Sequence, residues 1–319
     1  MKVLFVGASG FGLRCVTAMT EIDSIKVVGT ITNKREFTIS YAPGGVTNVL
    51  HADVQAFCEQ RQIACYVMQR NMSEPGLSAF VRQCAPDLMV VVGWYHMVPK
   101  SLRAIVPAIG LHASLLPDYS GGAPLVWSMI NGEKRTGISL FELSDGVDDG
   151  RLLGQGETDI SAQDTIETLY RRIETIGLQL LLDNLPRLAD GTVVYQVQDE
   201  TRRRVFPQRT PLDGKINWKW PANRVHDFVR AQTRPYPGAF GIVGGQKVTI
   251  WSSTLRQQPM ADITPGAVVA MDEGIVVGCG GGTSLVLGTI GVDDTDMTAA
   301  QWCAGFEGGA GAVFDVNDD

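Results

Sequence analysis

The chain has 319 residues, 45% of them hydrophobic and 19% charged, so it can form two domains and bury a sizeable core. Its 27 basic and 34 acidic residues give a formal net charge of −7, which disfavours a general nucleic-acid-binding protein. Six scattered cysteines form no C-x-x-C pair, and no apolar run reaches membrane-spanning length. These features indicate a cytoplasmic enzyme or binding protein with reduced cysteines, without a structural zinc site or membrane contact.

The first two-thirds of the chain alternates short β-branched runs with amphipathic stretches. Val3–Val6, Val27–Ile31 and Leu88–Val92 have the length and composition of strands buried on both faces of a parallel sheet. Val54–Gln62 and Gly76–Gln83 lie between them and have helical patterns. This alternation predicts βαβ units and an α/β domain with a Rossmann-like, mostly parallel sheet.

A longer helix is predicted to begin after Asp164. Asp164 can cap it, and Glu167 three residues later completes a capping box before a stripe of apolar residues. We expect this helix to end near Pro186. The following stretch, Asp199–Asp213, is polar, contains four arginines and two prolines, and is typical of a linker.

The remainder of the chain is rich in short β segments. A helical pattern at Ala222–Ala231 precedes apolar runs such as Lys247–Trp251 and Ser284–Leu287, which glycines separate. This spacing favours a small barrel or sandwich. The predicted boundaries are 1–198 for the first domain, 199–215 for the linker and 216–319 for the smaller β-rich domain.

The glycine-rich segment Gly7–Gly12 follows the first predicted strand and resembles a dinucleotide-binding turn. Leu13 stands where the G-x-x-G-x-x-G pattern needs its last glycine, and no tyrosine has a lysine four residues on, as the short-chain dehydrogenases require. A tight strand-to-helix turn is therefore favoured. A nicotinamide oxidoreductase is the weaker alternative.

The stretch Gly110–Gly150 contains the residues best suited to catalysis. His112 belongs to one predicted strand, and Asp148 and Asp149 follow another, Ile138–Leu143. Because the carboxyl ends of neighbouring parallel strands face one crevice, His112 can meet an aspartate there. The carboxylate would orient the imidazole, which can transfer a proton near neutral pH. On spacing alone, a structural histidine and an Asp-Asp-Gly turn are the more common interpretations, and the catalytic one is the minority.

These motifs together resemble the 10-formyltetrahydrofolate-dependent formyltransferases, a family that acts on methionyl-tRNA and on nucleotide-linked amino sugars. The family pattern is Asn-x-His-x-Ser-Leu-Leu-Pro, then Thr-Gly, then Asp-x-Gly. This chain has His112, Ser114–Pro117, Thr136-Gly137 and Asp148–Gly150 in the same order. The resemblance covers nearly the whole chain and implies a Rossmann-like catalytic domain followed by a barrel like those that bind oligonucleotides and oligosaccharides (OB-like).

The resemblance also implies roles for individual residues, with 10-formyltetrahydrofolate as co-substrate and no metal. His112 would polarise the formyl carbonyl or move a proton, and Asp148 would orient His112. Gly110 occupies the position of the family asparagine, and Ser120 that of an arginine. The remaining matched positions are Tyr95, Met97, Val98, Pro99, Ser114, Leu115, Asp145 and Asp148 for the folate, and Gly10, Phe11, Tyr119, Ser120 and Gly121 for the amine substrate.

Gly110 removes a side-chain donor to the oxyanion, and the loss of one such donor typically costs about a hundred- to a thousandfold in rate. Three explanations are open. Another group, such as Ser114, His96 or a water, could supply the donor. The pocket could serve another acceptor or another one-carbon reaction. The chain could also bind folate without turnover.

The charge distribution favours a small acceptor. From residue 206 onward, the chain has eight basic and twelve acidic residues, so the net charge of this part is negative, which disfavours binding of a transfer RNA. The loop after the second strand offers only Lys34 and Arg35 before Thr38–Val46, and Arg202–Arg204 is expected to be a solvated charge run. We expect a small primary amine, first a nucleotide-linked amino sugar, with a transfer-RNA enzyme as the alternative and a homodimer left open. The candidate aromatic platforms for this substrate are Tyr41, Trp94 and Tyr119.

Overall fold

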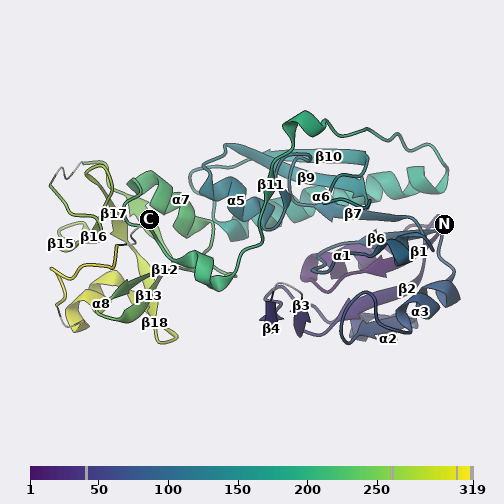
Figure 1. The fold of residues 1–319 in the computed structure, drawn as a ribbon, viewed down its shortest axis with the longest axis horizontal. Helices are drawn as coiled ribbons and strands as arrows, with labels where there is room; N and C mark the ends of the chain where they lie inside the picture. Colours follow the sequence, from purple (N-terminus) through teal and green to yellow (C-terminus); the bar gives the residue numbers. More distant parts are fainter. Residues whose placement is uncertain (40–41, 259, 261, 307, 317–319) are drawn as a thin grey trace. The chain divides into compact units, whose positions relative to one another are not determined.

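The computed structural model describes residues 1–39, 42–258, 260, 262–306 and 308–316, and divides into two compact units (Figure 1). The first unit comprises Met1–Gly121, Thr136–Thr158 and Arg171–Phe206, and the second comprises Gly122–Arg135, Asp159–Tyr170 and Pro207–Asp319. The units interleave along the chain, whereas the sequence predicts continuous domains. Within the described residues, no helix is long and apolar enough to cross a membrane.

A seven-stranded sheet forms the centre of the first unit. β1 pairs in parallel with β2 and β6, β6 pairs in parallel with β7, and β7 pairs antiparallel with β9. The sheet is therefore mostly parallel, which confirms the predicted α/β class. Its strands lie in the order β10 (Leu152–Asp159), β9 (Arg135–Glu142), β7 (Ala108–His112), β6 (Leu88–Val91), β1 (Lys2–Val6), β2 (Lys26–Asn33) and β5 (Cys65–Met68).

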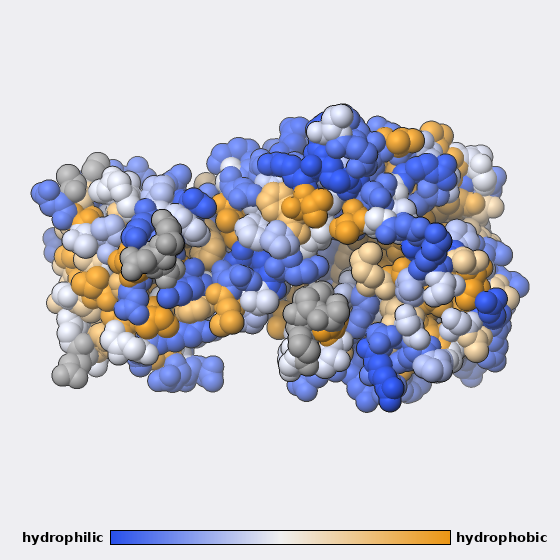
Figure 2. Space-filling view, in the orientation of Figure 1, coloured by the Kyte–Doolittle hydropathy of each residue, from blue (hydrophilic) through white to orange (hydrophobic). Residues whose placement is uncertain are grey.

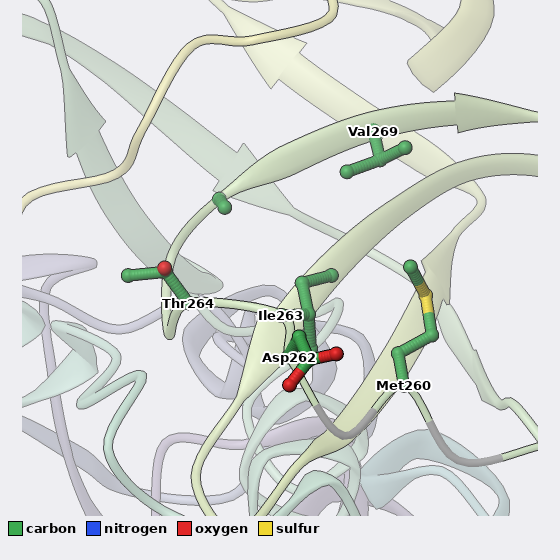
Figure 3. Close-up of a pocket in the computed structure, with 6 residues that line it drawn as sticks. Met260, Asp262, Ile263, Thr264 and Val269 are labelled. Carbon is green, nitrogen blue, oxygen red and sulfur yellow. The ribbon is translucent and has the colours of Figure 1, made fainter.

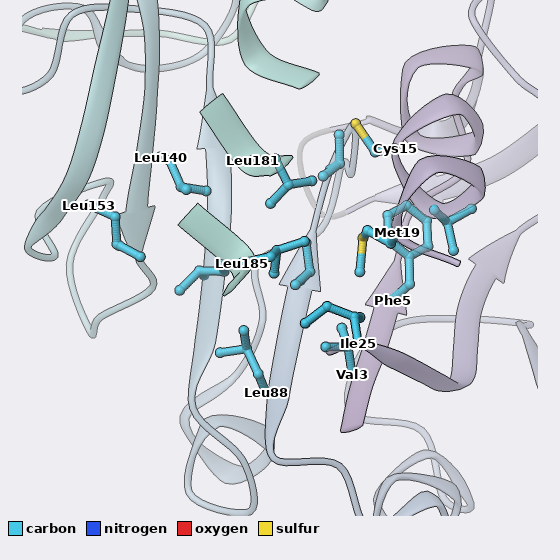
Figure 4. Packing of buried hydrophobic residues seen from close by; sticks show 14 residues of the cluster. Val3, Phe5, Cys15, Met19, Ile25, Leu88, Leu140, Leu153, Leu181 and Leu185 are labelled. Carbon is cyan, nitrogen blue, oxygen red and sulfur yellow. The ribbon is translucent and has the colours of Figure 1, made fainter. Parts of the chain in front are cut away.

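Alternate residues of β1 point to opposite faces of the sheet, and each face has a helical cover. Val3 and Phe5 pack in a cluster with α1 (Gly10–Met19) and with Leu181 and Leu185 of the long helix α6 (Ile166–Ala189) (Figure 4). This cluster is fully buried at its centre because the strand is apolar at every position after Lys2.

The opposite face of the sheet has a second cluster. Leu4 and Val6 pack there with residues of α3 (Leu77–Cys84) and α4 (Lys100–Arg103). Helix α2 (Val54–Arg61) contacts β2 and β5. Since both faces are covered, the carboxyl ends of the strands are the natural place for polar chemistry.

The long helix α6 (Ile166–Ala189) differs from its prediction at both ends. Thr165 and Thr168 exchange side-chain and backbone hydrogen bonds at its start, and Asp164 accepts from the Thr168 hydroxyl at 2.8 Å and from the Ser161 amide at 2.7 Å. The helix also continues past Pro186, because that proline lies in the last turn and costs one backbone hydrogen bond there. Leu185 beside it is fully buried in the core and helps to hold this turn in place.

The glycine-rich turn after β1 is a tight connection, as the sequence predicts. A Cβ atom at Gly7 would lie 2.5 Å from the carbonyl oxygen of Val92, so glycine permits this close approach. Ser9 caps α1 by accepting from the amide of Gly12 at 3.0 Å. The Gly10 amide donates to the Leu50 carbonyl at 2.9 Å and is thus already satisfied by the protein.

The segment that the sequence assigns to a loop after β2 contains a hairpin, β3 (Glu36–Ile39) and β4 (Ala42–Thr47). The segment after α6 is also more ordered than the predicted linker. It contains two short 3₁₀ helices, Glu200–Arg202 and Pro211–Gly214, and strand β11 (Val205–Phe206). β11 pairs in parallel with β8 (Ser120–Gly121), so the chain as far as Phe206 belongs to the first unit, whereas Pro211–Gly214 belongs to the second.

The second unit is β-rich, as predicted, and contains two antiparallel four-stranded sheets and the helices α5 (Pro124–Ile130), α7 (Ala222–Arg230) and α8 (Ala299–Gly305). Its core includes Trp218 and Phe314, whose ring centroids lie 4.9 Å apart. One sheet has the order β12 (Ala239–Val243), β13 (Gln246–Ile250), β18 (Thr289–Val292) and β19 (Thr295–Thr298). The other has the order β14 (Ser253–Leu255), β17 (Thr283–Leu287), β16 (Gly274–Cys279) and β15 (Val268–Met271).

A hollow in the second unit is lined mainly by apolar side chains (Figure 3). Among the described residues that line it, Asp262 is the only charged one, so these residues do not provide the paired titratable groups that catalysis requires. The other lining residues are Met260, Ile263, Thr264, Ala267 and Val269.

Candidate active site

His112 is the last residue of β7 and lies between two acceptors. Its Nδ1 atom is 3.6 Å from Oδ2 of Asp148, and its Nε2 atom is 2.8 Å from the carbonyl oxygen of Tyr119. Because a carbonyl oxygen can only accept, Nε2 carries a hydrogen in this arrangement and Nδ1 faces the carboxylate. Only 12% of the His112 side chain and 22% of the Asp148 side chain are exposed. The structure therefore brings together the two residues predicted to act as a pair.

Asp148 is held in an uncommon backbone conformation. Its φ angle is +53°, in the left-handed region that non-glycine residues rarely adopt. Its Oδ2 atom accepts a hydrogen bond from the Gly121 amide at 2.8 Å. A Cβ atom at Gly150 would lie 1.8 Å from the Glu142 carbonyl oxygen, so the Asp-x-Gly motif needs its glycine for a close approach. The neighbouring Asp149 points instead to the hydroxyl of Ser144.

Gly110 lies inside β7, opposite Phe141 of β9. A Cβ atom at this position would lie 3.2 Å from Cδ2 of Leu143 and 3.4 Å from the Val91 carbonyl oxygen. The side chain of Leu143 therefore occupies the space beside Gly110. A larger residue at position 110 requires Leu143 to move.

The groups considered as replacement donors differ in their availability. The Ser114 hydroxyl donates to the carbonyl oxygen of Asp118 at 2.7 Å, so its hydrogen is already used. In contrast, Nε2 of His96 and Nε1 of Trp94 are buried and have no hydrogen-bond partner among the described residues. Burial lowers the pKa of His96, which favours its neutral form.

The predicted folate segment lies between β6 and α4. The Tyr95 hydroxyl donates to the Asn48 side chain at 3.2 Å, and Pro99 caps α4. Val98 is buried, whereas 67% of Met97 is exposed. Asp145 accepts from Lys100 at 2.8 Å and from Arg103 at 2.6 Å, and these hydrogen bonds lower the pKa of its carboxyl group.

Leu115 completes the set of predicted folate residues. Its side chain packs against Gly137, where a Cβ atom would lie 2.5 Å from Cδ2 of Leu115 and 2.3 Å from the Gly156 carbonyl oxygen. Because Gly137 of the Thr-Gly motif has no side chain, Leu115 and the backbone of β10 can both pack directly against it.

The predicted substrate residues fall into two groups. Tyr119, Ser120 and Gly121 adjoin the His112–Asp148 pair through backbone contacts. The Tyr119 ring is buried and stacks on Phe206 with centroids 4.4 Å apart, so Tyr119 meets His112 with its carbonyl group and not with its ring. Gly10 and Phe11 lie in the first turn of α1, where Phe11 packs against the core. Tyr41 lies outside the described residues.

Two residues of the site, Gln198 and Arg203, are absent from the sequence-based prediction. The Gln198 amide donates to the carbonyl oxygens of Asp148 at 2.8 Å and Gly150 at 2.6 Å. Arg203 donates to the Ser120 hydroxyl at 2.6 Å. The Arg202–Arg204 run is the signal that could have found Arg203, and its interpretation as solvated charge is wrong for that residue, whose side chain is largely enclosed. Arg204 pairs with Asp118 at 2.6 Å and remains exposed.

Acid–base chemistry is what this arrangement can perform with protein groups alone. No group of three or more His, Cys, Asp or Glu side chains in the described part of the chain is placed to hold a metal ion. A histidine that faces a carboxylate at the end of a strand is suited to proton transfer during group transfer.

Comparisons with known proteins agree on one fold. An N-formyltransferase from Helicobacter canadensis, solved with folinic acid and dTDP-3-aminofucose, is 16% identical with a TM-score of 0.64, covering 90% of this chain and 98% of its own. Methionyl-tRNA formyltransferase from Clostridium thermocellum is 18% identical with a TM-score of 0.55, and the match covers 80% of this chain and 94% of that one.

A third match is HypX from Aquifex aeolicus, solved in complex with tetrahydrofolic acid. It is 17% identical with a TM-score of 0.63, and the match covers 94% of this chain but 46% of that one. This chain therefore spans about half the length of the HypX chains that it matches. At these identities the three similarities establish the fold.

Family models match both parts of the chain. The formyl transferase model matches residues 1–185, and the model of the formyl transferase C-terminal domain matches residues 209–307. The first match includes both His112 and Asp148, and together they cover most of the sequence. The chain belongs to the formyl transferase family.

Proposed function

We propose that this protein is an N-formyltransferase that moves the formyl group of 10-formyltetrahydrofolate to a primary amine of a small molecule. The observation that carries the proposal is the position of His112 at the end of β7, between Asp148 and the Tyr119 carbonyl. Membership of the formyl transferase family supports the same reaction class.

Formyl transfer forms a bond between the amine nitrogen and the formyl carbon and breaks the bond between that carbon and the folate nitrogen. It requires an uncharged amine at the formyl carbon, stabilisation of negative charge on the formyl oxygen, and passage of a proton from the amine to the departing folate nitrogen. His112 meets the last requirement in the tautomer whose Nδ1–H faces Asp148, because the unprotonated Nε2 can then leave the Tyr119 carbonyl, take the proton from the amine and pass it to the folate nitrogen. Asp148 orients the ring and stabilises the charge that His112 gains. The enclosed position of both side chains limits competition from water.

The residues around the predicted folate segment fit a polar heterocycle. Trp94 offers a buried N–H donor without a partner, and His96 offers a buried, neutral ring nitrogen. A ligand that bonds these atoms would remove two unsatisfied polar groups, whose burial costs free energy. The folate co-substrate would therefore be held by this segment and by the neighbouring Tyr95 and Val98.

A nucleotide-linked amino sugar is the amine that we favour. The structurally similar Helicobacter canadensis enzyme was solved with dTDP-3-aminofucose. The excess of acidic residues after position 206 disfavours transfer RNA. Gly110 and Leu143 support a second candidate, a folate-binding relative with weak turnover, because this pair leaves no side-chain donor at position 110.

The test is release of tetrahydrofolate from 10-formyltetrahydrofolate in the presence of nucleotide-linked amino sugars, free amines or methionyl-tRNA. We expect amine-dependent release, greatest with an amino sugar. His112→Ala and Asp148→Asn should each lower the rate by about a hundred- to ten-thousandfold, as the loss of general acid–base catalysis does.

Asp149→Asn is the matched control, since this adjacent carboxylate faces Ser144. Near wild-type rates for the His112 or Asp148 variant would refute the assigned site. Folate binding without release for every amine would favour the second candidate.

A further inference from the structure

The side chain of Arg203 joins three segments of the first unit. Its guanidinium donates to the Ser120 hydroxyl at 2.6 Å, to the Val147 carbonyl at 3.2 Å and to the Gln198 side chain at 3.1 Å. Glu200 binds the same guanidinium and fixes its orientation. Only 15% of the Arg203 side chain is exposed, so this is an enclosed contact.

Gln198 extends the contact to the two residues that flank Asp149. Its amide nitrogen donates to the carbonyl oxygens of Asp148 and Gly150, while its side-chain oxygen accepts from Arg203. Gln198 is itself buried, with 6% exposed. Three carbonyl groups of the turn Val147–Gly150 are thus bound by two side chains that lie about fifty residues later in the chain.

This turn needs external support because of the conformation of Asp148. A non-glycine residue at φ +53° is strained, and such a conformation persists when its surroundings hold it. If the turn relaxed, the Asp148 carboxylate would leave both the Gly121 amide and His112. Arg203 contacts Ser120, the residue before Gly121, so it binds both sides of this junction.

We propose that Arg203 and Gln198 are positioning residues for catalysis, which form a clasp that keeps Asp148 directed at His112. This inference rests on the proposed formyl transfer at that pair. The clasp acts through geometry: the planar guanidinium satisfies several acceptors at fixed angles, which a lysine ammonium cannot reproduce. A displacement of about 1 Å at a catalytic group can cost roughly a hundredfold in rate.

The first test compares Arg203→Met with Arg202→Met. Arg202 is adjacent and exposed, so its substitution removes the same charge from the same segment. We expect Arg203→Met to lower kcat at least about tenfold, because small displacements of a reacting group are costly, with little change in the KM for folate. Arg202→Met should keep the wild-type kcat. Equal kcat values for the two variants would overturn the proposal, as would a loss confined to KM.

A double-mutant cycle then asks whether Arg203 acts through Asp148. In an Asp148→Ala background, Arg203→Met should cause little further loss of kcat, because the group that it positions is gone. Full additivity of the two losses would contradict the clasp. Gln198→Glu should resemble Arg203→Met, since it places a carboxylate oxygen against two carbonyl oxygens. If Arg203→Met does not fold, Arg203→Lys takes its place.

A structural measurement separates this inference from the proposed function. Hydrogen exchange of the Gly121 amide should be faster in Arg203→Met than in Arg202→Met, because that amide is bonded to Asp148. Wild-type protein without formyl transfer would refute the proposed function, while the exchange rates would still decide the clasp. Equal exchange in the two variants would refute the clasp even in an active enzyme.

Discussion

At position 110, the side chain of Leu143 fills part of the space that a side chain at Gly110 would occupy. Leu143 fills the space beside Gly110, and the nearest backbone atom there, the Val91 carbonyl oxygen, is 3.4 Å from the position that a Cβ atom would take. An asparagine added here would meet an apolar neighbour before it could reach any ligand. The glycine and the leucine therefore need to be treated as a pair.

We expect Gly110→Asn alone to lower the free energy of unfolding by about 1–3 kcal/mol, because it overpacks the site against Leu143. The double variant Gly110→Asn/Leu143→Ala should recover part of the overpacking cost and allow the amide to enter the pocket. Denaturant unfolding of the two variants and of Leu143→Ala gives the free energy of unfolding of each, and from these values the interaction energy between positions 110 and 143. Strict additivity would show that the two positions do not compete for space.

His226 gives a prediction about pH. Burial and the nearby Arg230 lower the pKa of His226 below its ordinary value of 6.5. The unfolded chain therefore takes up this proton first as the pH falls, so the associated stability is present above pH 6.5 and declines below it. We expect His226→Gln to show a smaller loss of stability than wild type between pH 7.5 and 5. Parallel pH curves for the two proteins would contradict this.

At this scale the sequence predicts the His112–Asp148 pair, because a motif order and the geometry of parallel strands both place them together. It does not predict Leu143 beside Gly110, which depends on side-chain packing between β7 and the residue after β9. The sequence shows that Arg203 belongs to a run of basic residues, but it does not indicate which groups the side chain contacts. Its contacts arise when β11 returns to β8, a long-range pairing of two residues that leaves no periodic signal.

At the scale of elements, Gly137 decides how closely β9, β10 and the Leu115 segment can approach. The Gly156 carbonyl oxygen lies 2.3 Å from a Cβ position at Gly137, and backbone atoms cannot move aside as the end of a side chain can. Gly154 on β10 is a contrasting case, because its nearest neighbour, at 2.9 Å, is Cδ1 of Leu180.

We therefore expect Gly137→Ala to lower the free energy of unfolding by about 1–3 kcal/mol and Gly154→Ala to lower it less. Thermal unfolding of the two variants is the measurement. Equal shifts in Tm would show that backbone crowding at Gly137 is relieved elsewhere.

The ends of α6 show why boundaries are harder to predict than elements. Asp164 and Glu167 form a plausible capping box in the sequence, but Thr165 and Thr168 supply equivalent bonds one residue later. Local hydrogen-bond alternatives of similar strength cannot be ranked without the tertiary structure. Pro186 is tolerated for a tertiary reason as well, since its neighbour Leu185 is buried in the core.

At the scale of the molecule, the charge balance bears on the acceptor. Hydrophilic residues cover much of the face seen in Figure 2, with smaller hydrophobic patches between them. The formal net charge of −7 disfavours binding of a polyanion such as transfer RNA. We expect binding of methionyl-tRNA to be weak near physiological salt and to show a shallow salt dependence, because few phosphates would be neutralised.

Filter binding across a salt series checks this expectation, with a polyanionic dextran as the control for non-specific attraction. A steep decrease of affinity with salt, specific to the transfer RNA, would favour the alternative acceptor.

The sequence predicts two structural classes correctly, an α/β part and a β-rich part, because hydrophobic periodicity changes along the chain. It does not predict that Gly122–Arg135 and Asp159–Tyr170 join the second unit. Their helical and extended patterns resemble those of their neighbours in sequence. Their assignment depends on contacts with residues far along the chain, such as the bonds from Arg230 to the carbonyl groups of Ser161 and Asp164.

The late position of the clasp has a consequence for synthesis. A growing chain contains His112 and Asp148 well before Gln198, Arg203 and β11 leave the ribosome. At about 5–20 residues per second, the interval from Asp148 to Phe206 lasts roughly 3–12 s. Until that interval ends, the nascent protein contains His112 and Asp148 without the contacts that Gln198 and Arg203 make to the turn Val147–Gly150. The proposed site would thus be assembled near the end of translation of the first unit, and a chain that ended before Gln198 would lack these contacts.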